Sequence, residues 1–449
     1  MSSTPHGWKL LKLRDIATLK TGPFGSALHK ADYTVGGIPL INPTHIKNGK
    51  LAPSIEVSVS PETAERLSDY QLNKDDIVMG RRGEMGRCAV VPEHAQNWLC
   101  GTGSVVVKST FAAHPNYLQR FLTAPATVAA LIGDSVGSTM INLNQGVLLG
   151  LDIPLAPLPE QKRIADKLDS VLARVDACRD RLDRLPALLK RFRQSILAAA
   201  TSGQLTEDWR KTKKYQWDRR PIESIAEVID PHPSHRTPPE VCDGVPYISI
   251  GDLNSQGEFD FDNARKVGPD VLKEHKARYK IEEGDFIFGK IGTIGKPTKL
   301  PLDREYTVSA NVLLIKANNG IVYGDYLRLV FTSPNFMSSV MERSTATSQA
   351  AFGIKKMRTA EIQLPPLPEQ TEIVRRVELL FAFADRLEAR LASARQKVGQ
   401  LTPALLAKAF RGELVPQDPA DEPAAELLKR LAAQREAAPK ARRGRASKA

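Results

Sequence analysis

The stretches IADKLDSVLARVDACRDRLDRLPALLKRFRQSI at 164–196 and IVRRVELLFAFADRLEARLASARQKVGQLTPAL at 373–405 decide the fold. In each, apolar residues recur in alternating steps of four and three, and the second stretch begins 209 residues after the first. A period of 3.5 residues keeps one stripe of a helix facing a partner helix, so each stretch predicts a long helix whose seam can pair with the other. The first seam consists of Ile164, Leu168, Val171, Val175, Cys178, Leu182, Leu185, Leu189, Phe192 and Ile196. The second consists of Ile373, Val377, Leu380, Ala384, Leu387, Leu391, Ala394, Val398, Leu401 and Leu405.

The repeat extends over most of the chain at the same offset. Pro-Leu-Pro-Glu-Gln at 157–161 returns at 366–370, where proline in the first turn and the glutamate after it favour a helix start. Gly203 and Gly412 follow the two seams and suit left-handed helix caps. Pro186 and Pro403 lie inside the helical pattern, where proline removes a hydrogen bond, so we expect a bend or a break near each.

Each half therefore predicts a globular domain followed by a long helix. Runs rich in Val and Ile predict strands at 76–79, 104–108, 245–250 and 312–316. Apolar residues at helical spacing predict helices at 117–123 and 326–331. The expected fold class is α+β, with two similar mixed α/β domains, two long helices and a pseudo-two-fold internal repeat. The expected parts are domains at 1–155 and 207–364, helical regions at 156–206 and 365–415, and a basic, Ala-rich, mostly disordered tail at 416–449.

The charge balance favours a polyanionic partner. The chain of 449 residues carries 63 Lys and Arg against 51 Asp and Glu, a net charge of +12. Nucleic acid is the first partner to consider at this charge, with a ribosome or a membrane surface as the rival. Neither a run of about 18 apolar residues nor a signal peptide is present, so we expect a cytoplasmic protein.

The tail after Val415 changes in composition. Residues 426–434 could form a short helix, whereas the remainder lacks the apolar content to fold. Lys440, Arg442, Arg443 and Arg445 make its end basic. Both a non-specific contact with nucleic acid and a neutral solubilising role stay open for it.

The sequence lacks the patterns of a catalytic centre. The strings at 42–44 and 230–233 do not fit the active-site motif of an adenine methyltransferase, and 289–296 does not fit a phosphate-binding loop. The four cysteines show no CxxC spacing. Cys88, His94 and Cys100 come nearest to a set of metal ligands, but ordinary buried thiols explain the two cysteines better than a metal site does. We therefore expect neither an enzyme nor a metal protein.

The segments that repeat with chemical character are glycine-rich, basic or polar. The loop at 80–87 aligns with the loop at 289–296. The basic residues of the two loops, which could bind phosphates, are Arg81, Arg82, Arg87, Lys290 and Lys296. A turn needed only for folding explains the glycines equally well. The polar stretches at 137–142 and 345–350 offer short side chains for base edges or sugars. The remaining candidates for DNA binding are Thr44, His45, Lys47, Ser138, Thr139, Asn142, His235, Arg236, Thr347 and Ser348. The segment around His235 and Arg236 has no equivalent in the first half, which suggests two different recognition surfaces.

Four features together point to a known family: the paired Pro-Leu-Pro-Glu-Gln segments, the ends at Gly203 and Gly412, the element at 21–26 and the strands before the glycine loops. In these features, residues 1–415 resemble the specificity subunit of a type I restriction-modification system. The resemblance implies two target-recognition domains alternating with two helical regions that form an antiparallel coiled coil. It implies a non-catalytic subunit that binds a split, asymmetric site in double-stranded DNA.

The resemblance also implies partner subunits. These are two methyltransferase subunits, which use S-adenosylmethionine to methylate adenine, and two restriction subunits, which use ATP and Mg²⁺; no cofactor is expected in this chain. The alternatives are a coiled-coil scaffold without sequence-specific DNA binding and an enzyme in its own right. Binding that weakens steeply with salt would favour DNA contact over the scaffold.

Overall fold

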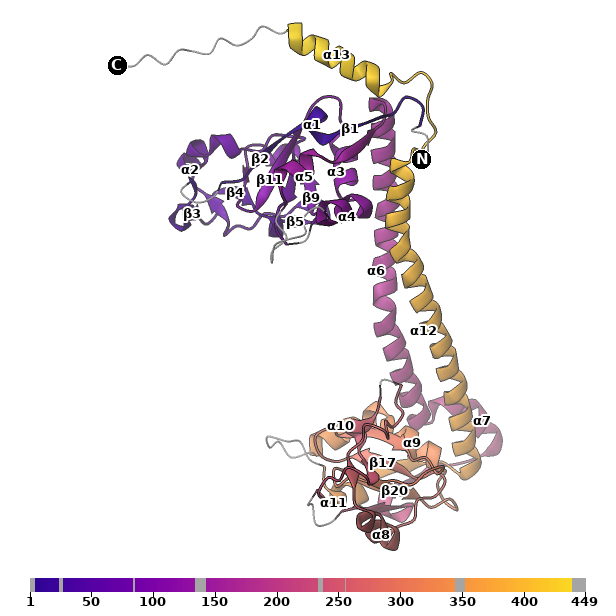
Figure 1. The fold of residues 1–449 in the computed structure, drawn as a ribbon. Coiled ribbons are helices and arrows are strands. Elements are labelled where there is room, and N and C mark those ends of the chain that lie inside the picture. The colour runs from indigo at the N-terminus through magenta and orange to yellow at the C-terminus, as the bar shows by residue number, and fades with distance from the viewer. Residues whose placement is uncertain are drawn as a thin grey trace. The chain divides into compact units, whose positions relative to one another are not determined.

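The computed structural model describes residues 5–23, 27–83, 85–133, 143–232, 237–254, 256–343 and 352–437. The chain divides into two compact units, residues 1–181 with 394–449, and residues 182–393. Each unit holds one globular domain and one part of each of two long helices. Figure 1 labels the elements of both units.

The first domain is built on an antiparallel sheet of order β2-β11-β8-β9. Its strands are β2 (Ala17–Thr21), β11 (Ser104–Ser109), β8 (Ile77–Gly80) and β9 (Cys88–Val90). A second sheet of order β10-β4-β7-β3 consists of β10 (Leu99–Cys100), β4 (Ile38–Ile41), β7 (Ser58–Val59) and β3 (Tyr33–Thr34). The short pairs are β1 (Lys9–Lys12) with β12 (Asp152–Leu155) and β5 (Ile46–Lys47) with β6 (Lys50–Leu51). The helices are α1 (Leu13–Ile16), α2 (Pro61–Arg66), α3 (Pro115–Leu122), α4 (Pro125–Gly133) and α5 (Gln145–Leu149).

The second domain repeats this plan with the sheet order β14-β20-β17-β18. Its strands are β14 (Ala226–Ile229), β20 (Val312–Ala317), β17 (Phe286–Gly289) and β18 (Gly295–Lys299). The other sheets are β16 (Lys266–Val267), β15 (Val245–Ile248) and β19 (Thr307–Val308), and the pair β13 (Asp218–Pro221) with β21 (Glu361–Leu364). The helices are α8 (Pro269–Arg278), α9 (Gly324–Thr332), α10 (Pro334–Arg343) and α11 (Ile354–Arg358). The expected strands and helices are confirmed, except that β15 ends at Ile248.

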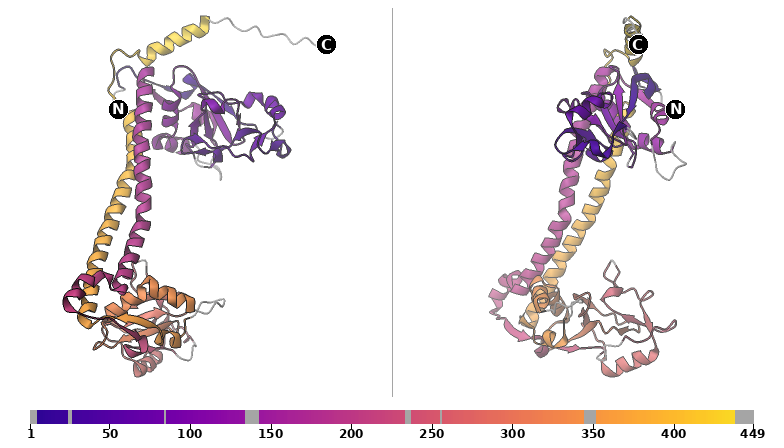
Figure 2. Two further views of the ribbon diagram at one scale, coloured as in Figure 1. Left: turned by 180° about the vertical axis from the view of Figure 1, so that it is seen from behind. Right: turned by 90° about the vertical axis from the view of Figure 1, so that its left-hand side faces the viewer.

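The long helices are α6 (Leu158–Ser202) and α12 (Leu367–Phe410), and within each unit they lie side by side (Figure 2). In the first unit, Ile164 and Leu168 near the start of α6 share a core cluster with Leu406 and Ala409 near the end of α12. In the second unit, Ile196 near the end of α6 shares a cluster with residues at the start of α12. The helices therefore pack antiparallel, as the resemblance implied.

The seams are less buried than their period suggests. Cys178, Leu185 and Leu401 occupy seam positions and are exposed. Burial varies along each seam, since Val175 and Leu391 are buried although they belong to no domain core cluster of the described residues. Ile164 and Ile373 share core clusters with residues of the domains and are fully buried.

Neither interior proline breaks its helix. Pro186 lies inside the 45 residues of α6, and Pro403 lies inside the 44 residues of α12. Of the expected bend or break, the continuous helices therefore exclude the break at both positions. A proline removes one backbone hydrogen bond, and the turns on either side keep theirs. Gly203 and Gly412 follow the helices with φ of +82° and +75°, as predicted for left-handed caps.

Two buried glutamines attach the domains to the helix starts in the same way. The side-chain amide of Gln161 donates to the carbonyl oxygens of Ala112 and Ala156, at 3.0 and 2.8 Å, and its oxygen accepts from the backbone N–H of His114 at 2.7 Å.

The Gln370 amide donates to Ile321 and Pro365 at 3.1 and 2.8 Å and accepts from Tyr323 N–H at 2.6 Å. Each partner lies 209 residues after its counterpart in the first half. The repeated Pro-Leu-Pro-Glu-Gln segment is therefore the joint between domain and helix.

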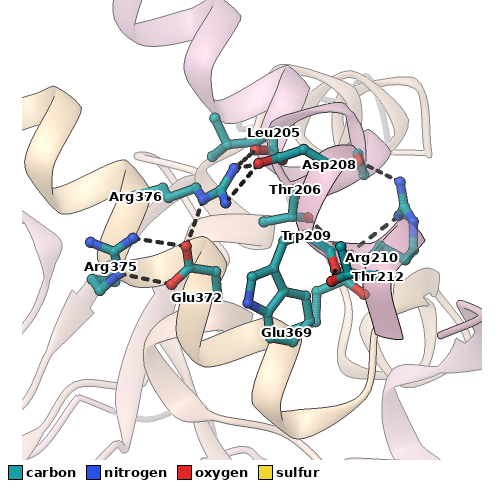
Figure 3. Close-up of polar contacts among 11 residues, drawn as sticks. Leu205, Thr206, Asp208, Trp209, Arg210, Thr212, Glu369, Glu372, Arg375 and Arg376 are labelled. Atoms are coloured by element: carbon teal, nitrogen blue, oxygen red, sulfur yellow. Dashed lines mark hydrogen bonds and ion pairs between the residues drawn. The ribbon is translucent and has the colours of Figure 1, made fainter. Parts of the chain in front are cut away.

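The start of α12 is also held by the segment that follows α6, which includes α7 (Glu207–Lys213) (Figure 3). The Thr206 hydroxyl donates to the buried Glu369 carboxylate at 2.8 Å. Arg376 pairs with Asp208 at 2.8 Å and with Glu372 at 2.7 Å, and it donates to the Leu205 carbonyl at 2.8 Å.

The segment after Val415 differs from the expected tail. Helix α13 (Ala424–Ala437) is longer than the predicted 426–434, and it packs Ala424 and Leu427 into the core of the first domain. Asp421 forms an ion pair with Arg163 of α6 at 2.6 Å, and the N–H of Ala424 donates to the Gly7 carbonyl. Composition alone underestimated this segment because two buried apolar side chains anchor it on an existing core. Residues 438–449 lie outside the described residues.

In the described ranges, no helix combines the length and the apolar character that crossing a membrane requires.

Candidate nucleic-acid interface

The glycine-rich loops connect equivalent strands of the two domains, β8 to β9 and β17 to β18. Gly86 and Gly295 have φ of +81° and +96°. A Cβ atom at Gly86 would lie 2.3 Å from a methyl carbon of Val128 in α4, and one at Gly295 would lie 2.6 Å from the terminal methyl of Met337 in α10. Folding therefore accounts for these glycines, because the positive φ strains any other residue at both positions and the Val128 contact adds a clash at Gly86.

Each glycine loop is hydrogen-bonded to a residue that follows the polar stretch of its own domain. The N–H of Leu143 donates to the Arg81 carbonyl at 2.9 Å, and the N–H of Phe352 donates to the Lys290 carbonyl at 2.8 Å. We call the glycine loop together with this anchored residue the loop edge. Five candidates, Ser138, Thr139, Asn142, Thr347 and Ser348, lie outside the described residues, directly before these anchors.

The equivalent cations Arg81 and Lys290 have different surroundings. The Lys290 side chain is buried, and its ammonium group donates to the Asp230 carboxylate at 2.6 Å. Arg81 is half-buried, and its Nε atom is buried without a hydrogen-bond partner among the described residues. The residue equivalent to Asp230 in the first domain is Thr21, which carries no charge.

The other basic candidates in the glycine loops lie nearer the surface. Arg82 and Lys296 are exposed, and Lys296 has a φ of +50°. Arg87 is half-buried, and its guanidinium group donates to the carbonyl of Pro43 at 3.4 Å. Pro43 also lies 3.1 Å from the position of a Cβ atom at Gly80, so the segment around it contacts the first loop edge.

The segment after Pro43 supplies both exposed and buried side chains. Thr44 and Lys47 are exposed. The His45 ring is buried, with Nδ1 at 3.0 Å from the Leu40 carbonyl oxygen and 3.3 Å from the Asn42 nitrogen. His45 thus stabilises the turn that presents its neighbours. His235 and Arg236 lie outside the described residues.

The described residues contain no group of three or more His, Cys, Asp or Glu side chains placed to hold a metal ion. Burial raises the pKa of the Cys88 and Cys100 thiols to about 12, so both stay protonated at neutral pH. These thiols are structural rather than reactive.

Asp230 is the residue at this interface that the sequence analysis missed. Asp230 was considered there only as part of a methyltransferase-like string. Comparing the halves at the offset of 209 pairs it with Thr21, at the end of β2, which β11 separates from the strands of the glycine loop. A carboxylate that appears in one copy only, near a lysine of the same copy, is the pattern that could have identified it.

Comparisons with known proteins agree with this arrangement. The chain is 29% identical to the EcoBI specificity subunit of Escherichia coli, over 97% of this chain and 94% of the relative. It is 30% identical to the EcoKI specificity subunit of Escherichia coli strain K12, over 96% of each. The HsdS subunit from Thermoanaerobacter tengcongensis shares the fold, with a TM-score of 0.60 at 17% identity over 92% of this chain and 98% of that one.

The family model of the type I restriction modification DNA specificity domain matches the chain twice, at residues 5–187 and 216–394. The two matches correspond to the two copies of domain and helix described above. Because they cover most of the chain, the protein belongs to the type I restriction-modification specificity subunits, the non-catalytic members of these systems.

Proposed function

We propose that this specificity subunit binds a bipartite, asymmetric DNA site, with one half-site contacted by each domain. The observation that carries the proposal is the loop edge, which is built by the same hydrogen bond in both domains but has different side chains around it. Two domains that share the backbone of the loop edge but differ in its side chains are suited to two half-sites of different sequence. The net charge of +12 supplies the attraction to phosphates.

The paired helices are proposed to set the distance between the half-sites. At a rise of about 1.5 Å per residue, each helix is about 65 Å long. Inserting one heptad in the middle of both α6 and α12 keeps the seam in register and adds about 10 Å. That length corresponds to about three base pairs.

We further propose that the helices dock two methyltransferase subunits, with S-adenosylmethionine bound there, and that restriction subunits bring ATP and Mg²⁺ chemistry. Apolar side chains on the helices of the second unit support a protein contact. Leu188 is 53% exposed, Leu379 58% and Phe383 46%. Exposed apolar side chains on neighbouring helices suit the packing of further helices.

The test is to co-express the protein with the methyltransferase subunit of the same system and to map methylated adenines by sequencing. Two specific half-sites with a fixed gap are expected, and the heptad insertion should lengthen the gap while both half-sites stay the same. Methylation without a bipartite motif, or an unchanged gap, contradicts the proposal. A coiled-coil scaffold would instead show DNA affinity nearly independent of salt.

A further inference from the structure

Asp230 connects two parts of the second domain through one carboxylate. It directly follows β14, and its Oδ2 atom accepts from the Lys290 ammonium group at 2.6 Å. Its Oδ1 atom accepts from the backbone N–H of His232 at 3.2 Å. His232 is the last described residue before the segment that holds Ser234, His235 and Arg236.

Lys290 extends this connection to a third segment through its backbone. Its N–H donates to the Asn311 carbonyl at 2.9 Å, and its carbonyl accepts from Phe352 at 2.8 Å. The Asp230–Lys290 pair therefore connects the chain leading toward His235, the glycine loop and Phe352, the first described residue after the polar stretch. These are the three parts of the second domain that carry its predicted DNA contacts.

The burial of the pair decides what the lysine can do. The side chains of Lys290 and Asp230 are 5% and 16% exposed, so the ammonium group is covered and its charge is matched within the domain. A cation that contacts a DNA phosphate must be accessible and must add positive charge to the surface. In the first domain the position of Asp230 is held by the uncharged Thr21, and the half-buried Arg81 forms no ion pair with another described residue.

We propose that Asp230 and Lys290 are a positioning pair for recognition of the second half-site, whereas Arg81 contacts a DNA phosphate of the first half-site directly. The inference rests on the proposed function. It assigns opposite tasks to two basic residues at equivalent positions of the repeat. Removing Arg81 should cost a phosphate contact, and removing Lys290 should loosen the segments that recognise bases.

The experiment compares Arg81→Gln with Lys290→Gln in the full chain, bound to its methyltransferase subunit. DNA affinity is measured over a series of salt concentrations, and methylated sites are mapped by sequencing. For Arg81→Gln, the slope of log affinity against log salt should fall by about 1, with both half-sites unchanged. For Lys290→Gln, the slope should stay as in the wild type, while the second half-site becomes degenerate.

A double variant guards against simple loss of folding. Asp230→Asn with Lys290→Gln replaces the ion pair by two neutral amides that can still hydrogen-bond. It should recover the second half-site in part and keep the wild-type slope. Lys429→Gln on α13, where the lysine is exposed, serves as the matched charge control and should change neither readout.

Two results would overturn the inference alone: a slope that falls equally in Lys290→Gln and Arg81→Gln, or a second half-site that stays intact in Lys290→Gln. A wild-type complex that methylates no bipartite site would overturn the proposed function and this inference together.

Discussion

The two domains are most alike where they join the helices and least alike at the loop edge. Gln161 and Gln370 each make three hydrogen bonds to partners at equivalent positions. At the loop edge, the backbone hydrogen bond is kept, but Lys290 is paired with Asp230 whereas the first domain has Arg81 and, in place of the aspartate, the uncharged Thr21. The difference shows that the attachment of a domain to its helix requires fixed chemistry, whereas the surface proposed to contact DNA does not.

A second contrast concerns how each junction is completed. In the second unit, the segment that follows α6 along the chain packs on the start of α12. In the first unit, the segment after α12 packs on the start of α6 and continues into α13 on the domain core. In the second unit, the segment that completes the junction directly continues α6. In the first unit, the segment that completes the junction is instead the C-terminal segment that follows α12.

The largest expected effect breaks the likeness of the two joints. Gln161→Leu and Gln370→Leu each leave one N–H and two carbonyl groups without a buried partner, so each should lower the free energy of unfolding by about 4 kcal/mol. Urea denaturation measures both. The exposed Gln194 and Gln396, changed to Leu, are matched controls on the same helices. A decrease in the free energy of unfolding in only one of the two glutamine variants would show that the two joints are not equivalent.

The next effect tests the C-terminal segment, which belongs to the first unit alone. Leu427 is 4% exposed in the core of the first domain. Leu427→Ala should therefore lower the free energy of unfolding by about 3 kcal/mol, because it removes buried methyl groups and leaves a cavity. Lys429→Ala, at an exposed position of the same helix, should change little. Equal stabilities of Leu427→Ala and wild type in urea would contradict the docking of α13.

The sequence predicted the parts of this fold that depend on local pattern. The 3.5-residue period located α6 and α12, and the offset of 209 located both copies of the main sheet. The pattern could not show that Cys178 and Leu185 would be exposed, because the period fixes which side chains face the partner helix and not how closely the two helices approach at each position. It also could not show the docking of Leu427, since that needs the shape of the first domain.

The candidate interface was predicted less completely than the fold. The glycine loops and polar stretches were expected as separate candidates, and the sequence did not show that one backbone hydrogen bond joins each loop to a residue just after the polar stretch. Whether a basic residue in them is exposed depends on residues distant in sequence. Lys290 is covered by a pair with Asp230, 60 positions away, and His45 is turned toward the Leu40 carbonyl. Binding by the individual candidates stays a prediction.

A pH-dependent difference should distinguish the two domains. Burial lowers the pKa of the His275 imidazole to about 4, from an ordinary 6.5, and its ring packs on His232 and Tyr279. The unfolded chain binds this proton below pH 6.5 and the folded chain does not, so stability is lost as the pH falls toward 4. The loss between pH 7 and pH 5 should be about 2 kcal/mol.

The measurement is urea denaturation of the wild type and His275→Asn at both pH values, and the variant should lose about 2 kcal/mol less. Counted from Pro61 and Pro269, which begin α2 and α8, the equivalent residue of the first domain is Leu67, which is buried and carries no titratable group. Arg66→Asn, at the neighbouring exposed position, is a control that should leave the pH dependence as in the wild type. An equal pH dependence in His275→Asn and wild type would remove this distinction between the domains.

The smallest effect concerns the charges at the two helix starts, which are opposite in sign at equivalent positions. Arg163 pairs with Asp421, whereas Glu372 pairs with Arg375 and Arg376 (Figure 3). Hydrogen bonds from these arginines lower the pKa of Glu372 to about 2, from an ordinary 4.5. Because the folded-state pKa is lowered, the stabilisation is complete above pH 4.5 and is lost as the pH falls from 4.5 toward 2.

Glu372→Gln should therefore lower the free energy of unfolding by about 1 kcal/mol at pH 7, since the arginines are partly solvated. The difference from wild type should shrink as thermal unfolding is followed from pH 6 down to pH 3. Glu378→Gln, at an exposed position of the same helix, is the matched control. A gap between Glu372→Gln and wild type that stays constant over this range would mean that packing, rather than charge, holds this junction.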